Sequence, residues 1–511
     1  YANGEGVIQD YRTALSWYQK AAANNFTLAQ FNMALMYYEG LGVPKNLEKS
    51  YIWNTIAEYN GNMDASHSRK LDERNMMPAE IEAAKEKVTS DPNLLTGAKF
   101  RDQTKLYHAD ANYNFQDFID WGEIQVGGSY RRYSLNSFGN IFTDADGPID
   151  YDEYGVYTQL QKNFLEEDRL KLTVSARYDK AQNFDGNVSP RLSLAYAGGE
   201  NKNHNFRASV QSGFRNPTTQ DQYIGLDVGN AILVGSAADN LDRYSTGALA
   251  VSPTGQFVAN TFGTTPIGAT TVLTGNNAYS NTFSASSVQA FAAGQIAAPI
   301  ATTTDLVKPE KVTAFEVGYR GLVNAGESRF TVDLSVYYNQ YEDFIANKNV
   351  LARGSNNDFK VVQLYSNSAA DINSYGASIG LNTKVLNGFS LGLNYTYAKF
   401  DFDQASDPDF EAGFNTPEHK VKVQFGNANL FENFGFNINA RWQDEYRWES
   451  TFLDATIASR TVLDAQINYR APKIKSVFKL GGSNLTGKEY LSAPGVGAIG
   501  SQYYLSWTIN N

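Results

Sequence analysis

The stretch at 168–180, DRLKLTVSARYDK, alternates between apolar and polar residues without interruption. Its apolar positions are Leu170, Leu172, Val174, Ala176 and Tyr178, and polar residues such as Lys171 and Arg177 stand between them. This period of two predicts a β-strand with one apolar and one polar face. The segments 329–339 and 434–442 repeat the pattern. We therefore expect a mainly β protein built from long, two-faced strands.

From residue 93 onward the same periodicity predicts about fifteen strands. They begin near residues 103, 121, 151, 169, 189, 204, 311, 329, 373, 389, 418, 434, 460, 476 and 502. Many run close to the 9–11 residues that a tilted strand needs to cross a bilayer, and Tyr or Trp often ends the apolar face. We infer that the apolar faces contact lipid. The wall-facing residues then include Leu172, Val174, Val332, Leu334 and Ile438.

Short and long connections alternate between these strands. The short ones are 164–168, 197–203, 322–328, 385–388 and 471–475, and the long ones are 134–150, 217–310, 342–372, 401–417, 447–459 and 488–501. Short periplasmic turns and long extracellular loops are typical of bacterial outer-membrane barrels. The pattern predicts an antiparallel transmembrane β-barrel.

Composition excludes several function classes. A net charge of −11 argues against a nucleic-acid partner, and the absence of cysteine excludes disulfides, thiolate metal sites and cysteine catalysis. The four histidines, His67, His108, His204 and His419, stand in no metal-ligand spacing. No apolar run reaches the roughly 18 residues of a transmembrane helix. We expect no catalytic residue, no cofactor and no metal site.

Residues 1–90 follow a different period. Gly4, Gly6, Val7, Trp17 and Ala21 recur 36 positions later as Gly40, Gly42, Val43, Trp53 and Ala57. A period near 36 predicts a small helical solenoid, in which the glycines permit tight loops and the Trp and Ala positions pack helix on helix. Thr27 and Gln30 predict a capping box that opens the second helix, and Pro44 predicts the start of the third.

At the repeated positions this segment resembles the Sel-like repeat family, relatives of the tetratricopeptide repeats, and MMPAEIEAAKEKV resembles that family's C-terminal helix. The resemblance implies a scaffold that binds a surface lipoprotein or another protein, whereas a merely structural helical cap is the alternative. The expected domains are thus a helical repeat domain at 1–90 and a β-barrel part at 93–511.

The β segment resembles the TonB-dependent outer-membrane receptors, especially those of Bacteroidetes type. The resemblance rests on 187–196, 206–223, 306–321, 415–423 and 479–490, in the order of the family's blocks. It implies a receptor in the outer membrane of a Gram-negative cell, and uptake energised by a TonB-type complex. It further implies a scarce, bulky ligand such as a siderophore, a glycan or a peptide, and no enzymatic activity.

Three features depart from that family. The N-terminal plug with its TonB box is missing, about fifteen strands stand where such barrels have about 22, and the ending LSWTINN lacks a terminal aromatic residue. We therefore expect an incomplete barrel that is open or gapped. Because the family's C-terminus lies in the periplasm, an odd strand count would put the helical segment outside the cell. A seam between unrelated parts is expected near Ser90–Leu94.

Three weaker features of the sequence each allow two interpretations. Asp144, Asp146 and Gly147 faintly resemble a calcium loop, but a polar turn is the expected reading. His204 is expected to be a turn residue rather than a lipase histidine. The connection 217–310 has no charged residue from Tyr244 to Thr304. Its aromatic residues Phe257, Phe262, Tyr279, Phe283 and Phe291 suit a neutral ligand or a lid, and a flexible low-complexity surface is the equal alternative.

The sequence is also compatible with two other functions. The chain could act as a protein-interaction scaffold through its repeats, or it could form a passive porin-like barrel. The sequence identifies no substrate-binding residue for any of the three.

Overall fold

The computed structural model describes residues 1–511 except 5, 24–25, 90–101, 229–230, 251–269, 327, 354–358, 386–387, 412, 451–453 and 510–511. The expected seam near Ser90–Leu94 therefore lies outside the described residues. The chain divides into two compact units. The first comprises Tyr1–Lys105, Ser134–Ile149 and Ile224–Leu233, and the second comprises Leu106–Tyr133, Asp150–Tyr223 and Val234–Asn511.

The first unit contains the N-terminal helices. They are α1 (Tyr11–Ala23), α2 (Thr27–Glu39), α3 (Leu47–Tyr59), α4 (Met63–Arg74) and α5 (Pro78–Thr89). Each of the first three packs on the next, and α5 packs on α3. Because α1 and α3 have the same length and begin 36 residues apart, the structural repeat follows the sequence repeat. None of the described helices is long and apolar enough to cross a bilayer.

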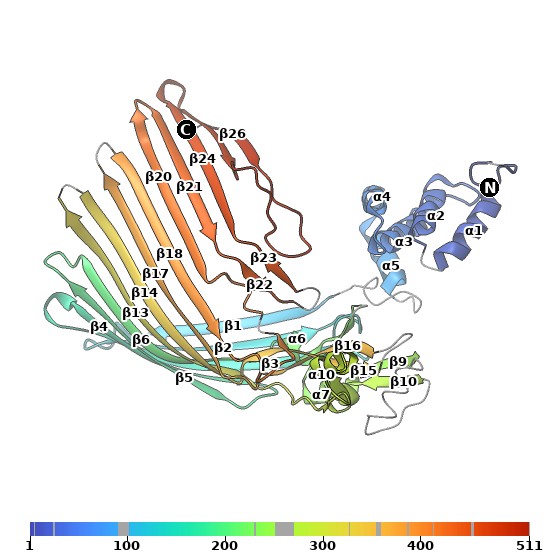
Figure 1. The fold of residues 1–511 in the computed structure, drawn as a ribbon, viewed down its shortest axis with the longest axis horizontal. Coiled ribbons are helices and arrows are strands. Elements are labelled where there is room, and N and C mark those ends of the chain that lie inside the picture. Colours follow the sequence, from blue (N-terminus) through green and yellow to red (C-terminus); the bar gives the residue numbers. More distant parts are fainter. Residues whose placement is uncertain are drawn as a thin grey trace. The chain divides into compact units, whose positions relative to one another are not determined.

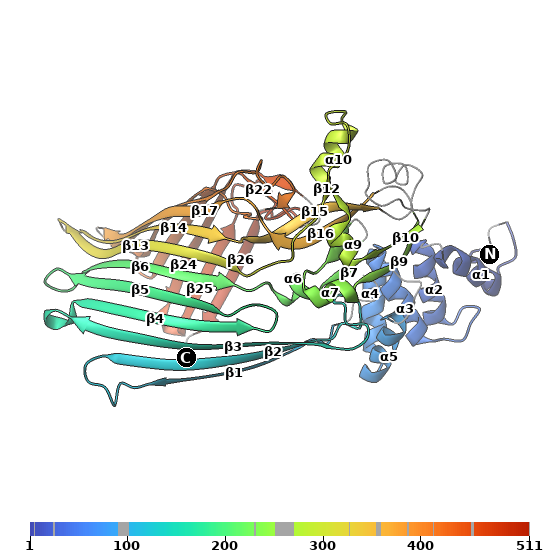
Figure 2. The same cartoon turned by 90° about the horizontal axis from the view of Figure 1, so that it is seen from below.

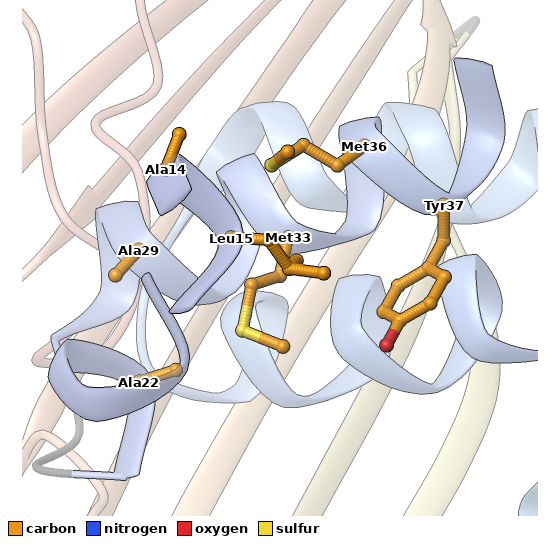
Figure 3. Packing of buried hydrophobic residues seen from close by; sticks show 7 residues of the cluster. All are labelled: Ala14, Leu15, Ala22, Ala29, Met33, Met36 and Tyr37. Carbon is orange, nitrogen blue, oxygen red and sulfur yellow. The ribbon is translucent and has the colours of Figure 1, made fainter. Parts of the chain in front are cut away.

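The core of α1 and α2 is small and apolar. Its buried side chains are Ala14, Leu15, Ala22, Ala29, Met33, Met36 and Tyr37 (Figure 3). The loop after α2 must pass close to the start of α1, and Gly42 makes this possible. A Cβ on Gly42 would lie 2.7 Å from the carbonyl carbon of Tyr11, and its φ of +69° also favours glycine.

Three details of the expected helices are wrong. Phe26, not Thr27, occupies the N-cap position of α2, and its side chain makes no capping hydrogen bond. The Thr27 hydroxyl instead donates to the Asn60 carbonyl at 3.2 Å. The third helix begins at Leu47 with Asn46 as its cap rather than at Pro44, because the Asn46 side chain accepts the Lys49 N–H at 2.9 Å. Trp17 is 55% exposed, because the described chain places no further helix against that side of α1.

The second unit is dominated by one antiparallel sheet of fifteen strands (Figure 1). In spatial order they are β1 (Lys105–Asn114), β2 (Glu123–Leu135), β3 (Ile149–Phe164), β4 (Leu170–Ala181), β5 (Asn187–Gly198), β6 (His204–Arg215), β13 (Glu310–Ala325), β14 (Ser328–Glu342), β17 (Ile372–Val385), β18 (Phe389–Asp401), β20 (His419–Phe431), β21 (Phe434–Gln443), β24 (Arg460–Ala471), β25 (Ser476–Ser483) and β26 (Gln502–Ile509). The strand count and the strand starts expected from the sequence are confirmed.

Strand register gathers the apolar residues on one face. Val174 lies opposite Leu160 and Leu192, and Leu334 lies opposite Tyr319 and Ile379. This apolar face is solvent-exposed over most of the sheet, as Val317 at 63% and Val336 at 58% illustrate. A wide exposed apolar face is what a lipid-facing wall requires.

The sheet is open. Its pairing order runs from β1 to β26, and the described residues contain no pairing between these two strands. Figure 1 shows the sheet curving without the two edges meeting. The expectation of an open wall is therefore confirmed, and a closed barrel is not formed by these strands alone.

The long connections are folded in their described parts. They contain α6 (Thr219–Tyr223), β7 (Gly225–Asp227), β8 (Ala231–Val234), α7 (Ala238–Arg243), β9 (Ser245–Ala250), β10 (Thr270–Thr274), α9 (Gly275–Ser280), β11 (Thr282–Ser284), α10 (Ala285–Ala292), β12 (Ala301–Thr302), β15 (Ile345–Arg353), β16 (Phe359–Asn367), β19 (Phe410–Glu411), β22 (Tyr446–Trp448) and β23 (Ala455–Ile457). Figure 2 shows α9, α10, β15 and β16 gathered at one end of the long strands. A featureless low-complexity surface is thus wrong for these parts, whereas Phe257 and Phe262 lie outside the described residues.

The remaining connections are short turns, two of which contain a 3-10 helix. These are η2 (Glu166–Asp168) between β3 and β4 and η4 (Pro472–Ile474) between β24 and β25. Apart from the short turn 182–186 between β4 and β5, the connections at one end of the sheet are long and those at the other end are short, as the sequence predicted.

Candidate functional site

A pocket of about 760 Å³ opens on the second unit near the long-connection end of β1–β6. Its lining comes from the middle of β1, the later parts of β2, β4 and β6, the earlier parts of β3 and β5, and the chain that follows β6. Because the side chains of a strand alternate between faces, several polar residues of the sheet converge here. The pocket lies on the end of the sheet that carries the long connections.

Charged groups of both signs line this pocket. Arg177 forms an ion pair of 2.6 Å with Asp179 and donates to the Ser129 hydroxyl at 3.0 Å. Arg131 lies 3.9 Å from Glu153 on the neighbouring strand. These pairs fix the side chains in place while leaving the charges near solvent, so they offer oriented donors and acceptors to a ligand.

Tyrosines add aromatic surface. The Tyr151 ring is fully buried, with ring centroids of Tyr133 and Tyr223 at 6.1 and 6.3 Å. The Tyr151 hydroxyl and the side-chain oxygen of Asn216 are buried and make no hydrogen bond to any of the described residues. Both residues line the pocket. Buried polar groups without partners are unusual, and here they point to a missing polar partner.

The long connections have a buried core of their own. The Tyr279 hydroxyl donates to the carbonyls of Val234 and Tyr365, at 3.0 and 3.2 Å. Gln220 donates to the Tyr365 hydroxyl at 3.1 Å. Burial raises the pKa of Tyr365 to about 12. The two connections that supply these residues, β6–β13 and β14–β17, therefore behave as one packed assembly.

Two carboxylates anchor this assembly near β6. Glu310 accepts hydrogen bonds from Arg215 at 2.7 Å and from the Ile345 N–H at 3.0 Å. Asp221 accepts the Thr218 N–H at 2.8 Å, yet burial raises its pKa above the usual range. Glu310 thus joins the end of β6 to the start of β15, and Asp221 fixes the turn that begins α6.

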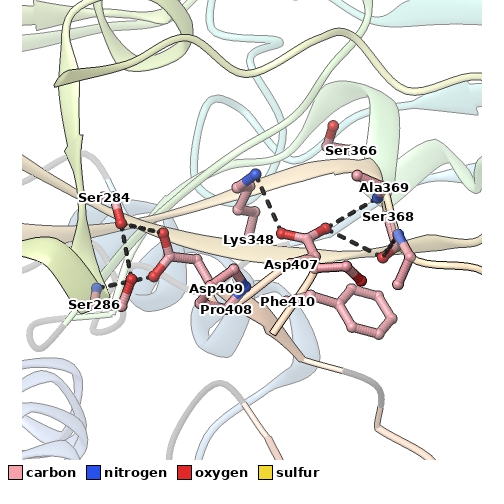
Figure 4. A network of polar contacts seen from close by, with 12 residues as sticks. Ser284, Ser286, Lys348, Ser366, Ser368, Ala369, Asp407, Pro408, Asp409 and Phe410 are labelled. Atoms are coloured by element: carbon pink, nitrogen blue, oxygen red, sulfur yellow. Dashed lines mark hydrogen bonds and ion pairs between the residues drawn. The ribbon is translucent and has the colours of Figure 1, made fainter. Parts of the chain in front are cut away.

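The connection between β18 and β20 joins the same assembly through a polar network (Figure 4). Asp407 accepts hydrogen bonds from the Ser368 hydroxyl and the Ala369 N–H, both at 3.1 Å, and Lys348 lies 3.4 Å away. Asp409 holds the start of α10. Phe344 adds apolar contact, with ring centroids of Phe400 and Phe410 at 5.5 and 6.0 Å. Three connections, β6–β13, β14–β17 and β18–β20, are thus tied together by side chains.

Of the residues that the sequence singled out, Asp144 and His204 lie outside the pocket, and His108 lines it. Asp144 belongs to the first unit, where its carboxylate accepts from Ser137 Oγ at 2.8 Å and the Gly139 N–H at 2.6 Å, so it stabilises a turn. His204 starts β6 and contacts the Tyr319 hydroxyl through Nδ1 at 2.8 Å. His108 lines the pocket, 3.8 Å from Asp110. Within the described residues, no three His, Cys, Asp or Glu side chains are grouped to hold a metal ion.

Sequence reasoning identified none of the polar pocket residues in advance as ligand-binding groups. They come from six strands that only the register brings together. One signal was available, because Arg131, Glu153, Arg177 and Asp179 are polar-face residues close to the long-connection ends of their strands. Charges at that height of a transmembrane barrel face the lumen entrance.

Comparison with known proteins gives consistent results. The family model described as TonB dependent receptor-like, beta-barrel matches residues 8–485. None of the curated proteins compared with the chain matches it. Solved structures with the same fold include the siderophore receptor PirA of Acinetobacter baumannii, at 14% identity and a TM-score of 0.50. That alignment covers 79% of this chain and 54% of PirA.

Two further structures are similar to the same extent. A mutant of the ferric enterobactin receptor PfeA of Pseudomonas aeruginosa has 14% identity and a TM-score of 0.51, covering 79% of this chain and 53% of PfeA. The iron transporter FrpB of Neisseria meningitidis has 12% identity and a TM-score of 0.51, with 79% and 54% covered. The chain spans about half the length of these receptors. Since the family match extends over most of its residues, the chain belongs to the TonB-dependent receptor-like β-barrel family of outer-membrane transport proteins.

Proposed function

We propose that this chain supplies part of the wall and the ligand-entry pocket of an outer-membrane receptor for a scarce, bulky nutrient. The observation that carries the proposal is the 760 Å³ pocket at the long-connection end, in which a buried hydroxyl and a buried amide oxygen lack partners. A pocket of this size and polarity suits a ligand with many hydrogen-bonding groups. It lies where a molecule arriving from outside the cell would first meet the wall.

The chemistry of the lining narrows the ligand class. Arg177 and Arg131 stand beside carboxylates, so the pocket offers neither a purely cationic nor a purely anionic surface. Tyr133 and Tyr157 offer ring faces as well as hydroxyls. A siderophore, a glycan or a polar peptide would use both kinds of contact. The similar PirA and PfeA structures are receptors for siderophores and ferric enterobactin, which favours the first of these classes.

Energised uptake would require further parts. Receptors of this family work with a TonB-type complex and an internal plug, and we assign neither role to the described strands. The helical repeats would give the receptor a separate surface for a protein partner. In this proposal the chain contributes binding and passage, and it performs no covalent chemistry.

Ligand binding tests the proposal directly. The full chain in detergent would be titrated with a ferric siderophore, an oligosaccharide and a peptide of similar size, with affinity measured by calorimetry. Replacing Arg177 with Gln or Asn216 with Ala should weaken binding of the preferred ligand by about tenfold. The matched control is Arg441→Gln, since Arg441 makes a similar ion pair of 2.8 Å with Asp464 on strands that do not line the pocket.

The outcomes separate the alternatives. Binding of one ligand class that is lost in the pocket variants but kept in the control supports a receptor. Passage of small solutes through liposomes carrying the chain, with no saturable binding to any probe, would instead support a passive porin-like barrel and contradict the proposal.

A further inference from the structure

A second cavity, of about 210 Å³, lies within the helical unit where α2, α3 and α4 meet. Leu35 and Leu71 supply apolar walls, and Tyr38 supplies an aromatic one. Glu39 stands at the rim, with an exposed side chain. The cavity has the size of one amino-acid side chain rather than of a large ligand. Its lining residues are separate from those of the pocket in the β unit, and a partner site here would specify the protein-binding surface that the proposed function gives to the helical repeats.

The polar lining of this cavity includes a buried amide with an unused oxygen. Asn54 is only 2% exposed, and its amide nitrogen donates to the Asp72 carboxylate at 2.8 Å. The Asn54 side-chain oxygen has no hydrogen-bond partner, and neither does the second oxygen of Asp72. The Ser50 hydroxyl does not supply the missing hydrogen bond to either oxygen, because it donates to the Asp72 oxygen that Asn54 already contacts. The site therefore has acceptors in excess and needs a donor.

The charge of the lining points the same way. Glu39 is the one charged residue among the lining side chains, and Asp72 lies directly behind Asn54. Burial raises the pKa of Asp72 despite the opposing effect of the Lys45 ammonium, so desolvation dominates at this carboxylate. The Tyr38 ring already has the Lys45 ammonium 4.7 Å from its centroid, so this ring accepts a cation in a suitable geometry.

Apolar walls with acceptors at the base and rim fit one kind of side chain. A lysine or arginine would lay its aliphatic stem against Leu35 and Leu71 while its head donates to the acceptors. A carboxylate would meet like charge, and an apolar side chain would leave the acceptors unpaired. We propose that this cavity binds a lysine or arginine side chain of a polypeptide partner, with Asn54 and Glu39 receiving its charged head.

Short peptides test this proposal on the full chain in detergent. The probes are alanine-based pentapeptides with lysine, arginine, norleucine or glutamate at the centre, and saturation-transfer NMR measures their binding. The lysine and arginine peptides should bind about tenfold more tightly than the norleucine peptide, because only they satisfy the acceptors. The glutamate peptide should not bind.

Variants locate the site. Glu39→Gln should reduce the preference for lysine over norleucine, whereas Glu86→Gln, an exposed carboxylate on α5, should not change it. Ser68→Leu places a larger apolar side chain in the cavity while leaving Asn54 and Asp72 in the sequence, so it should abolish binding of both cationic peptides. Far-UV circular dichroism would verify that the helices remain folded.

Three results would overturn the proposal: equal binding of lysine and norleucine peptides, binding that survives Ser68→Leu, or no binding of any peptide to folded chain. None of these would bear on the receptor proposal, which rests on the β unit.

Discussion

Ser284 and Asp409 lie 125 residues apart in the sequence, yet the Ser284 hydroxyl donates a hydrogen bond of 2.5 Å to the Asp409 carboxylate. The same carboxylate accepts the Ser286 N–H at 2.9 Å. Asp409, in the connection between β18 and β20, thus accepts a backbone N–H at the start of α10. An N-cap residue does the same from the position just before its own helix. This contact couples two long connections at the end of the sheet that carries the pocket (Figure 4).

Replacing Asp409 with Ala should loosen α10. The change removes two hydrogen bonds to a charged group, each worth about 1.5–3 kcal/mol, and leaves the Ser286 N–H without its acceptor. Hydrogen exchange followed by mass spectrometry should show faster exchange in 284–292, with the long strands unchanged. The control is Asp403→Ala, because Asp403 accepts the Ala405 N–H within its own connection. Equal effects of both variants on α10 would contradict the coupling.

The two faces of the sheet should differ in their tolerance of charge. Val174→Arg or Leu334→Arg should destabilise the chain by about 2–4 kcal/mol if the residue lies near the middle of the bilayer. Lys171→Gln, on the opposite face of β4, should have little effect. Urea unfolding from lipid vesicles measures both. Similar losses on the two faces would indicate a two-sided protein core instead of a wall.

The helical unit should depend on pH through Asp72. Its folded-state pKa is raised above the ordinary value of 3.8, mainly by burial, so the folded helices hold this proton more tightly than the unfolded chain. The resulting stability is complete below that ordinary value and is lost as pH rises through the raised one. Asp72→Asn should remove this dependence from the thermal unfolding of the helices, and exposed Asp64→Asn should keep it. An unchanged profile in Asp72→Asn would refute the assignment.

The core of the long connections should resist alkaline pH. Burial raises the pKa of Tyr365 to about 12, so its neutral form contributes stability that is complete below the unfolded value of 10.0 and is lost as pH rises through about 12. Ultraviolet titration of the chain should therefore lose one late-ionising tyrosine in Tyr365→Phe. The difference between the titrations of the unmodified chain and of Tyr365→Phe gives the ionisation of Tyr365 alone. Ionisation near the unfolded pKa of 10.0 would show that this residue is not buried.

The strands were predictable because their signal is local. Each strand alternates apolar and polar residues, and the lipid-facing side of a barrel imposes that alternation on every strand. Positions such as Leu172 and Val332 could therefore be placed on the wall before any partner strand was known. The open sheet followed from counting the same strands.

The pocket was not predictable in this way. Arg177 and Glu153 belong to different strands, and their approach depends on register and on which connections fold over them. The helix details failed for a similar reason. Thr27 has the residue type and spacing of a capping residue, but its hydroxyl donates to the Asn60 carbonyl. These two residues are 33 positions apart, so no local sequence pattern reveals the contact. Trp17 matches Trp53 in sequence, and only Trp53 packs against the helical core.

Residue-by-residue accessibility along β14 tests the central claim that the apolar face is a lipid-facing wall. The chain has no cysteine, so single cysteines at 330–339 can each carry a spin label without background. In lipid vesicles, electron paramagnetic resonance would compare collisions with oxygen, which concentrates in lipid, and with a water-soluble nickel complex. We predict that Phe330, Val332, Leu334, Val336 and Tyr338 positions favour oxygen and the intervening positions favour nickel. Equal access of the nickel complex to both sets would contradict a membrane wall.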